Sequence, residues 1–374
     1  MLLLDVTSTF FGTKDVLHVA ITSQITTVSS ALAVVAGIAI AVLSVRVRRR
    51  KLLLFGAALI PIGSVGCLLA PNFLALSIFF PFDGVGSIIV GSMAFALAGE
   101  TLSLRKRAKA MGWIVSGATW AQFFGAVLIR YFFAAGDWRS FLLWYSLPVS
   151  TFAFFFVYFC VPKVPFGTEG RVSESSYFRS FKEVFLNKSA TACLIGNMVR
   201  HAGMIWGIVY GATFLRIVFN QPLTNAALVV LCGTLAFALG SVLGGQVAHR
   251  VGRKHLAVSC ITMVGAFFAG AVYAPNVWIS VAFSLAANFG GGAASAGTLN
   301  MTVEQVPKKR GTIMSMSSVF VTLGATIGAA LGGAMLAFSS NFQITALAFV
   351  GLDFAAAGIY LLFTVDPCRT SRPK

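Results

Sequence analysis

Long apolar stretches, separated by short polar or basic segments, fill almost the whole chain. A helix needs about 20 mostly apolar residues to cross the hydrocarbon core of a bilayer, because each residue adds about 1.5 Å of length. Eleven stretches reach this length: 20–45, 52–71, 73–100, 108–135, 140–162, 190–217, 222–248, 255–274, 276–304, 311–337 and 342–364. Residues 1–13 are apolar too, but too short to cross a bilayer alone. The pattern predicts an all-α membrane protein with eleven complete transmembrane helices and a partial one before them.

The composition excludes a water-soluble globular protein. Only 10% of the residues are charged, 57% are hydrophobic and the mean hydropathy is +0.87, whereas soluble domains carry about 25% charged residues. The chain also contains 35 Phe and 37 Gly. Phe suits a lipid-facing surface and Gly lets membrane helices pack closely, so both counts indicate a multi-pass protein.

The basic residues predict the orientation in the membrane. Lys and Arg number 28 against 11 Asp and Glu, a net charge of +17. Alternation of the spans places six basic segments on one side: 46–51, 105–109, 163–188, 250–254, 308–310 and 369–374. The positive-inside rule makes these loops and the C-terminus cytoplasmic, in contact with anionic lipid head groups. The charge therefore sets orientation in a cell membrane, and we do not expect nucleic acid as a partner.

Cofactor and enzyme signatures are missing from the sequence. The six cysteines are scattered without the spacing of a metal site or a disulfide framework. No phosphate-binding loop, dinucleotide fingerprint or hydrolase motif occurs. The N-terminal residues lack the basic segment of a signal peptide. We therefore expect no enzyme activity, no metal and no cofactor, and a chain that acts as a monomer.

An internal repeat with an offset of 204 residues divides the chain into two halves. Three pairs of segments carry it: Ala70-Pro71-Asn72 with Ala274-Pro275-Asn276, Arg46, Arg49 and Arg50 with Arg250, Arg253 and Lys254, and Glu100 with Glu304. The offset then becomes 203, as for Met111 with Met314 and Gly125 with Gly328. The repeat predicts an N-terminal half at 1–162, a central loop at 163–189, a C-terminal half at 190–364 and a tail at 365–374.

Two features of this division stay open. Residues 177–185 of the central loop fit either an interfacial helix or a solvated linker. The helix at 190–217 predicts a first helix that would begin about fourteen residues before Met1. Either the start codon is assigned too late, which we favour, or the first helix is short.

Motifs in the loops carry a family resemblance along the whole chain. Residues 245–254 read Gly-Gln-Val-Ala-His-Arg-Val-Gly-Arg-Lys and resemble the family signature Gly-x-x-x-Asp-Arg-x-Gly-Arg-Arg, and residues 44–51 are a degenerate first copy. Trp138-Arg139 with Phe141 resembles the opening of helix six, and residues 307–311 resemble the loop before helix eleven. Together these motifs resemble the major facilitator superfamily. The resemblance implies twelve helices, the first incomplete, in two pseudo-symmetric halves that transport a solute by alternating access.

The sequence departs from the family pattern at several positions. The signature Asp is Val45 in one half and His249 in the other, and Phe80 stands where helix four usually carries an Arg. Residues 125–130 lack the proline that helix five shows in drug and proton antiporters.

Polar side chains at membrane depth are expensive and therefore candidates for the transport site. Asp5, Asp83, Arg200, His201 and Asn288 lie in helices one, four, seven and ten, which line the central cavity in transporters that resemble this chain. The further candidates for cavity walls are Gln122, Trp206, Trp120 and Tyr210. Aromatic residues in membrane helices also face lipid or pack inside the bundle, so the assignment of the Trp and Tyr residues has two readings.

Asp83 and Arg200 each have a functional and a structural reading. Asp83 lies two residues after Pro81, whose missing N–H should kink the helix and free a carbonyl. It is either a proton or cation acceptor, or a structural hydrogen-bonding group that pairs with Arg200. Arg200 and His201 either bind an anionic or polar group of the substrate or are satisfied within the bundle. Asp353, in the outer helix twelve, suits a structural pairing better.

The resemblance also assigns a gating role to residues at the cytoplasmic helix ends. They are Arg46, Arg49, Arg50, Arg250, Gly252, Arg253, Lys254, Glu100 and Glu304. Pairing of the two glutamates with nearby arginines would stabilise the outward-facing state.

We therefore expect a secondary active transporter of a small organic solute, coupled to protons and similar to efflux permeases of the drug and proton antiporter type. Facilitated diffusion or import of a solute is the nearest alternative. A membrane sensor that keeps the fold without transport is an alternative from another class.

Overall fold

The computed structural model describes residues 2–43, 47–101, 114, 117, 120–129, 138–161, 182–306 and 310–366. Within these ranges the regular elements are helices. Those of the first half are α1 (Leu3–Phe11), α2 (Val16–Leu43), α3 (Arg49–Leu69), α4 (Phe73–Thr101), α6 (Trp138–Phe141), η1 (Leu142–Ser146) and α7 (Leu147–Cys160). Those of the second half are α9 (Lys188–Val209), α10 (Gly211–Val218), α11 (Leu223–Val251), α12 (Arg253–Val272), α13 (Val277–Glu304), α14 (Arg310–Ser339) and α15 (Phe342–Phe363).

The observed helices confirm the fold class that the apolar pattern predicts. Among the described residues, 10 helices are long and apolar enough to cross a membrane, and each matches one predicted stretch. A shorter apolar helix at Trp120–Ile129 lies within the predicted stretch 108–135, and the remainder of that stretch is mostly outside the described residues. Residues 182–186 of the central loop are helical, and 177–181 also lie outside the described ranges.

Two predicted spans are not single regular α-helices. The stretch 190–217 divides at Tyr210, where α9 ends and α10 begins. The stretch 140–162 changes at η1 into a π-helix, which ends at Ser146, two residues before Pro148 of α7. Pro148 has no N–H to donate to the preceding turn, and the wider π-turn is a common way for a helix to accommodate such an interruption.

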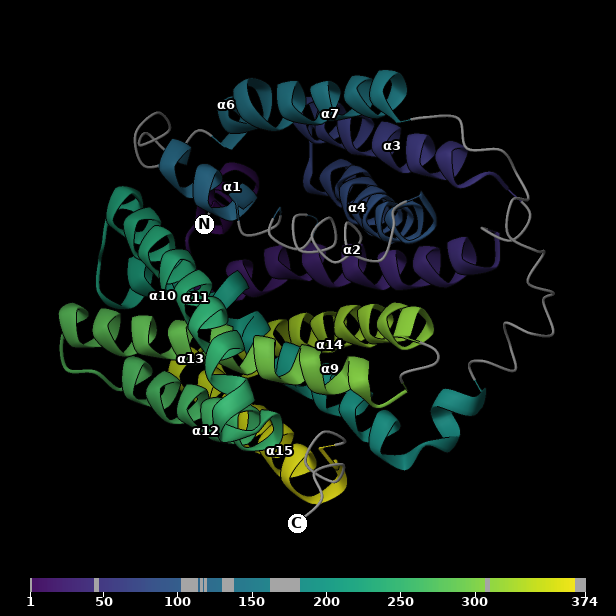
Figure 1. Cartoon of the computed structure of the whole chain (residues 1–374). Coiled ribbons are helices and arrows are strands. Elements are labelled where there is room, and N and C mark those ends of the chain that lie inside the picture. The colour runs from purple at the N-terminus through teal and green to yellow at the C-terminus, as the bar shows by residue number, and fades with distance from the viewer. Residues whose placement is uncertain are drawn as a thin grey trace, which may run out of the picture.

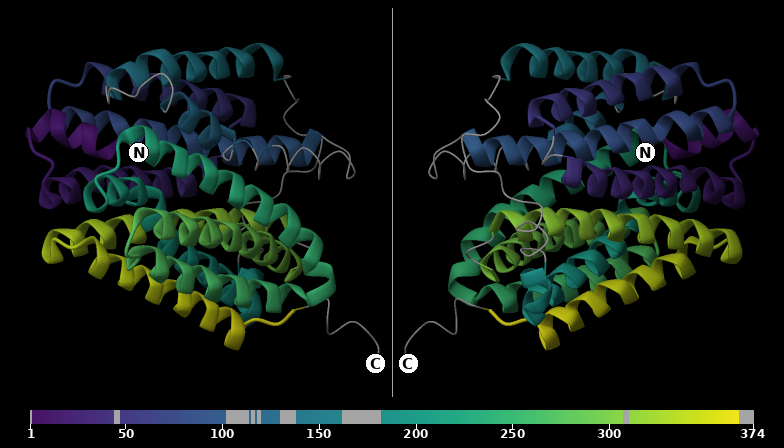
Figure 2. Two further views of the ribbon diagram at one scale, coloured as in Figure 1. Left: turned by 90° about the vertical axis from the view of Figure 1, so that its left-hand side faces the viewer. Right: turned by 90° about the vertical axis from the view of Figure 1, so that its right-hand side faces the viewer.

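The helices form two layers that correspond to the two halves of the sequence (Figures 1 and 2). In Figure 2 the purple and blue helices of the first half lie above the green and yellow helices of the second. The layers meet along α2 and α14, which pack side by side, as Figure 1 also shows.

Equivalent contacts recur in the two halves at the offset of 204 residues. The ring of Phe79 in α4 packs directly on Gly66 of α3, and the ring of Phe283 in α13 packs on Gly270 of α12 in the same way. The repeated Ala-Pro-Asn segment also acts alike, because Asn72 and Asn276 each accept a backbone N–H at the start of the next helix. These shared contacts support a tandem repeat.

One pair of contacts is reversed between the halves. In the first half, Gly84 of α4 leaves room for the hydroxyl of Ser29 in α2. At the equivalent positions of the second half, Gly233 of α11 leaves room for the amide of Asn288 in α13. Each helix pair therefore keeps its close approach with one glycine, but the glycine is on the opposite helix.

Candidate functional site

Polar contacts and a buried apolar cluster join the two halves at one end of the bundle. We call the end with Arg48–Lys51 and Arg253–Lys254 the basic end, and the other the far end. At the far end, α1 finishes at Phe11 and α10 at Val218. A buried apolar cluster joins the halves there. Its residues from the first half are Leu4, Val19 and Ala20, and those from the second are Trp206, Tyr210, Phe214, Leu215, Val272, Leu336, Phe342, Ala346 and Phe349.

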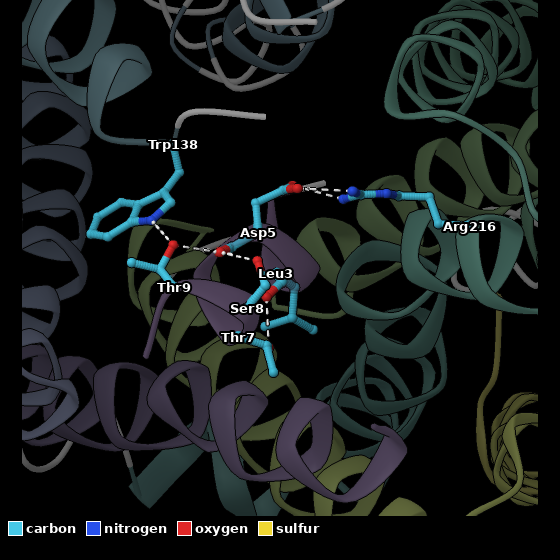
Figure 3. Close-up of polar contacts among 7 residues, drawn as sticks. All are labelled: Leu3, Asp5, Thr7, Ser8, Thr9, Trp138 and Arg216. Carbon is cyan, nitrogen blue, oxygen red and sulfur yellow. Dashed lines mark hydrogen bonds and ion pairs between the residues drawn. The ribbon is translucent and has the colours of Figure 1, made fainter. Parts of the chain in front are cut away.

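An ion pair between Asp5 and Arg216 connects α1 to α10 at this end (Figure 3). Arg216 Nη1 donates to Asp5 Oδ2 over 2.7 Å, and Nη2 donates to Oδ1 over 2.8 Å. Each side chain is only 11% exposed. Parallel N–H···O bonds of this kind are the strongest ion-pair geometry that proteins use. We call this pair the Asp5–Arg216 latch.

Hydrogen bonds from threonines fix α1 in the position that the latch requires. The Thr7 hydroxyl lies 2.8 Å from the carbonyl oxygen of Leu3 and 3.0 Å from the hydroxyl of Thr22 in α2, within hydrogen-bonding distance of both. On the other side of the helix, the indole N–H of Trp138 donates to Thr9 over 3.0 Å, as Figure 3 shows. The helix ends at Gly12, whose φ of 68° is a left-handed conformation that glycine adopts without strain. The Asp5 carboxylate therefore projects from a helix held on two sides.

Contacts between α2 and the second half add to the latch. The hydroxyls of Ser23 and Tyr210 share a hydrogen bond of 2.7 Å, and both residues are fully buried. Gly333 of α14 lies against the side chains of Ser23 and Gln24 with no room for a side chain of its own. The break between α9 and α10 thus coincides with a tyrosine that bonds the opposite half.

A second polar group is buried within the second half, around α9. Arg200 is 4% exposed and donates through Nη1 to Ser295 Oγ of α13 over 3.1 Å and to Met204 Sδ over 3.2 Å. One turn earlier, Asn197 donates to Thr302 of α13, and its carbonyl oxygen accepts from the Tyr360 hydroxyl of α15 over 2.8 Å. Arg200 does not pair with Asp83.

Asp353 of α15 completes this buried group. Its side chain is 2% exposed and lies directly over Gly203 of α9, one turn beyond Arg200. Asp353 Oδ1 and Arg200 Nε are both buried without a hydrogen-bond partner. The two charges therefore share one region of the bundle without a salt bridge between them.

The structure distributes the other predicted transport residues between exposed and buried positions. Asp83, Gln122 and Asn288 are exposed, and His201 is half-buried with Nδ1 3.1 Å from the carbonyl oxygen of Asn197. Trp206 is 2% exposed and packs edge-to-face on Phe268 inside the far-end cluster. Trp206 is thus a packed residue in this structure, and Asp5 is engaged by Arg216, which the sequence did not single out.

The residues predicted to gate the basic end brace each half internally. Arg50 donates from Nε to the carbonyl of Val161, just after α7, over 2.8 Å. Its repeat equivalent Lys254 donates from Nζ to the carbonyl of Thr364, after α15, over 2.7 Å. A cation at the C-terminus of a helix binds a carbonyl oxygen that has no partner within the helix, and it interacts favourably with the negative end of the helix dipole.

The remaining gating residues are described in part. The backbone N–H of Arg253 donates to Asp366, and Gly252 holds a φ of 96° in the turn between α11 and α12, which explains the glycine of the motif. Arg49 and Glu304 have polar or ionic partners. Arg46 and the side chains of Glu100 and Arg250 lie outside the described part of the structure.

An apolar groove lies away from all of these residues. It has a volume of about 520 Å³ and runs between α3, α4 and α7, lined by Pro61, Ile62, Val65, Phe79 and Leu147 among others. Its lining residues carry no charged side chain. We do not assign the transported solute to it.

Comparisons with known proteins place the chain in a family. A sequence profile of the Major Facilitator Superfamily matches residues 4–233 and 202–374. The chain belongs to this superfamily. It is therefore a multi-pass membrane transporter and not an enzyme, and like other members of the superfamily it binds a small-molecule substrate.

Relatives and solved structures of the superfamily agree with the fold. The chain is 22% identical over 305 residues to the uncharacterized MFS-type transporter YceJ of Bacillus subtilis (strain 168), covering 80% of this chain and 76% of YceJ. It is 27% identical over 165 residues to the gentisate transporter of Corynebacterium glutamicum, covering 43% of this chain and 37% of that protein. The crystal structure of a D-xylose-proton symporter superimposes with a TM-score of 0.80 at 13% identity and covers 97% of this chain and 92% of that one.

Proposed function

We propose that this superfamily member exports a small organic solute by alternating access and couples the export to protons. The observation that carries the proposal is the position of the contacts between the halves. Hydrogen bonds that join described residues of the two halves, Asp5–Arg216 and Ser23–Tyr210, lie at the far end. At the basic end, Arg50 and Lys254 bond within their own halves. The positive-inside rule puts the basic end in the cytoplasm, so this arrangement is closed to the outside.

Alternating access requires the far-end contacts to break and re-form. The contacts are of a kind that can do so, because water can hydrogen-bond both partners of an ion pair or a hydroxyl pair when the halves separate, which offsets part of the loss. The apolar cluster around them excludes water while the halves are together. We infer that the far end is the outer gate and that its latch is the Asp5–Arg216 pair.

Asp83 is our candidate for the proton carrier. Its carboxylate lies in the middle of α4, two residues after Pro81, and is exposed rather than paired with Arg200. A carboxylate at membrane depth that reaches solvent in one state and not in the other can take up and release a proton during the cycle. Asn288, near the equivalent position in α13, is neutral and cannot replace it.

Proton coupling is tested with purified protein in proteoliposomes that contain a pH-sensitive dye. Gentisate, the solute in the name of one relative, is the first probe. We expect wild-type protein to move protons when gentisate is added, and Asp83→Asn to lose proton movement while it still exchanges labelled for unlabelled gentisate. Asp15→Asn is the control, because Asp15 is 72% exposed in the loop after α1. Proton movement that survives Asp83→Asn would show that another group carries the proton.

The direction of transport is tested in cells that express the protein and are preloaded with labelled solute. Export predicts faster loss of label than in cells without the protein, and collapse of the proton gradient should remove the difference. Accumulation from the medium would instead indicate import. Binding without translocation in liposomes would indicate a sensor.

A further inference from the structure

Arg200 is a buried guanidinium that leaves most of its hydrogen-bonding capacity unused. A guanidinium has five N–H donors in a planar fork. In the structure Nη1 alone makes hydrogen bonds, to Ser295 Oγ and Met204 Sδ. Nε is buried and has no partner. Unpartnered buried donors are rare in proteins, and each one calls for a physical explanation.

The unused donors lie on one edge of the guanidinium. Nε and Nη2 form the side-on edge, which presents two parallel N–H groups with the spacing of the two oxygens of a carboxylate. The hydrogen bonds to Ser295 and Met204 fix the opposite corner. The side chain is therefore held in place with an edge free that matches an organic carboxylate better than it matches a hydroxyl or an amide.

Asp353 explains how the bundle tolerates this charge without filling the edge. It is the buried acid of α15, and it lies over Gly203, one turn along α9 from Arg200. Its Oδ1 has no hydrogen-bond partner, so the two groups attract each other through the bundle without forming a salt bridge. A positive site whose counter-charge forms no salt bridge with it can accept a second anion, whereas a bidentate salt bridge would occupy two of its donors.

The location suits a transported solute. Ser295 belongs to α13 and Arg200 to α9, so the hydrogen bond between them spans the junction of these two helices. His201, the next residue along α9, is half-buried and therefore reaches the surface of the second half beside Arg200.

We propose that Arg200 binds the carboxylate of a small organic acid and that this acid is the class of solute that the protein transports. The proposal rests on the proposed transport function and names the substrate class of the same site. Ser295 and Met204 position the guanidinium, and Asp353 acts through charge and does not touch the solute.

Binding is tested with full-length protein in nanodiscs by thermal unfolding and by titration. The probes are two acids, benzoate and 3-phenylpropionate, each paired with its uncharged amide, benzamide and 3-phenylpropionamide. We expect both acids, but neither amide, to raise the unfolding temperature of the wild type. If the amides stabilise the protein as much as the acids do, or if neither acid has any effect, the proposal is wrong.

Three variants separate anion binding from a structural role of Arg200. Arg200→Lys keeps the charge but has no planar edge, so we expect its affinity for the acids to fall at least tenfold, roughly what the loss of one charge-assisted hydrogen bond produces. The affinity of the Arg200→Gln protein for the acids should fall about 30-fold or more. Lys182→Gln removes the same charge at an exposed position and should bind as the wild type does. Unchanged affinity in a folded Arg200→Lys protein would overturn the proposal, even where Arg200→Gln does not fold.

The outcome for this site can be told apart from the outcome for the proposed function. Carboxylate binding that depends on Arg200, without any translocation in liposomes, supports the site and removes the transport function. Proton-coupled transport that is equally fast for acids and amides, and is unaffected by Arg200→Lys, supports transport and removes the carboxylate site.

Discussion

Breaking the Asp5–Arg216 latch should open the far end of the bundle. The variant Asp5→Asn keeps the size of the side chain and removes its charge. Its amide oxygen can still accept one of the two bonds that Arg216 makes over 2.7 and 2.8 Å. The wild-type pair is bidentate and each partner is 11% exposed, so it is neither a solvated surface pair nor a fully buried one.

The size of the effect follows from that intermediate burial. Removing one partner of a desolvated, hydrogen-bonded charge pair costs about 2–5 kcal/mol, and fully exposed pairs contribute about 0–1 kcal/mol. The remaining exposure and the retained single bond place Asp5→Asn at the lower end, at about 2 kcal/mol. Since about 1.4 kcal/mol is a factor of ten, the ratio of open to closed protein at the far end should rise roughly 30-fold.

Distance measurements between spin labels test this prediction. Labels at Lys14, between α1 and α2, and at Pro222, before α11, stand at the far end on different halves and are both exposed. The six native cysteines would first be replaced. We expect two distances between the labels, a shorter one when the far end is closed and a longer one when it is open. Asp5→Asn should increase the population of the longer distance, and Asp15→Asn, at an exposed position, should leave both populations unchanged. The latch assignment is refuted if Asp5→Asn changes the populations less than twofold, or if both variants change them equally.

Three further predictions concern the contacts that hold the bundle together. Tyr210→Phe removes the hydrogen bond to Ser23, worth about 1 kcal/mol, and should shift the same spin-label equilibrium roughly fivefold towards the open form; no shift would mean that the hydroxyl pair does not hold the gate. Gly292→Ala places a methyl group against the carbonyl of Phe237 and should destabilise the protein by about 1–3 kcal/mol in thermal unfolding. In Gly351→Ala the added methyl group has nothing within 4 Å, so the unfolding temperature should not change. Trp206→Ala empties a site that is 2% exposed and should cost about 3–5 kcal/mol, while Trp144→Ala, at 73% exposed, should change the unfolding temperature little; equal effects would contradict the packing described here.

The helices could be predicted from sequence because the membrane imposes their length and apolarity. The stretch 222–248 and the helix Leu223–Val251 agree at one end to a single residue, and 276–304 agrees as well with Val277–Glu304. The division at Tyr210 could not be predicted in the same way. It accompanies a hydrogen bond to Ser23, 187 residues earlier, and no local signal distinguishes it from a continuous apolar span.

The candidate site was predictable in its members but not in its pairings. Asp5 stands out as a carboxylate at membrane depth, and such a group requires a partner. Arg216 was visible near the end of the apolar stretch 190–217, at a matching depth, and that match was the signal that sequence reasoning missed. Asp5 and Arg216 are 211 residues apart and belong to different halves. Their pairing depends on how the halves pack against each other, and the sequence pattern of either half does not contain that information.

Arg50 and Lys254 show the opposite case. The repeat made them equivalent, and the structure gives them equivalent bonds to Val161 and Thr364. Their expected part in closing the bundle between the halves stays a prediction, because the bonds described here lie within each half.

The reversed glycines have a consequence for how this protein tolerates change. Each half has one helix crossing where a polar side chain packs on a glycine. In the first half the side chain is Ser29 of α2 and the glycine is Gly84 of α4. In the second half the glycine is Gly233 of α11 and the side chain is Asn288 of α13, so the two roles are exchanged between the helices. If the arrangement of the second half is copied into the first half by single substitutions, Ser29→Gly alone leaves a void and Gly84→Asn alone causes a collision. Both replacements together would restore the fit and place an amide at a crossing that now has a hydroxyl. Such crossings can exchange their chemistry only as matched pairs, which allows two copies of one architecture to acquire different linings without a change in helix spacing.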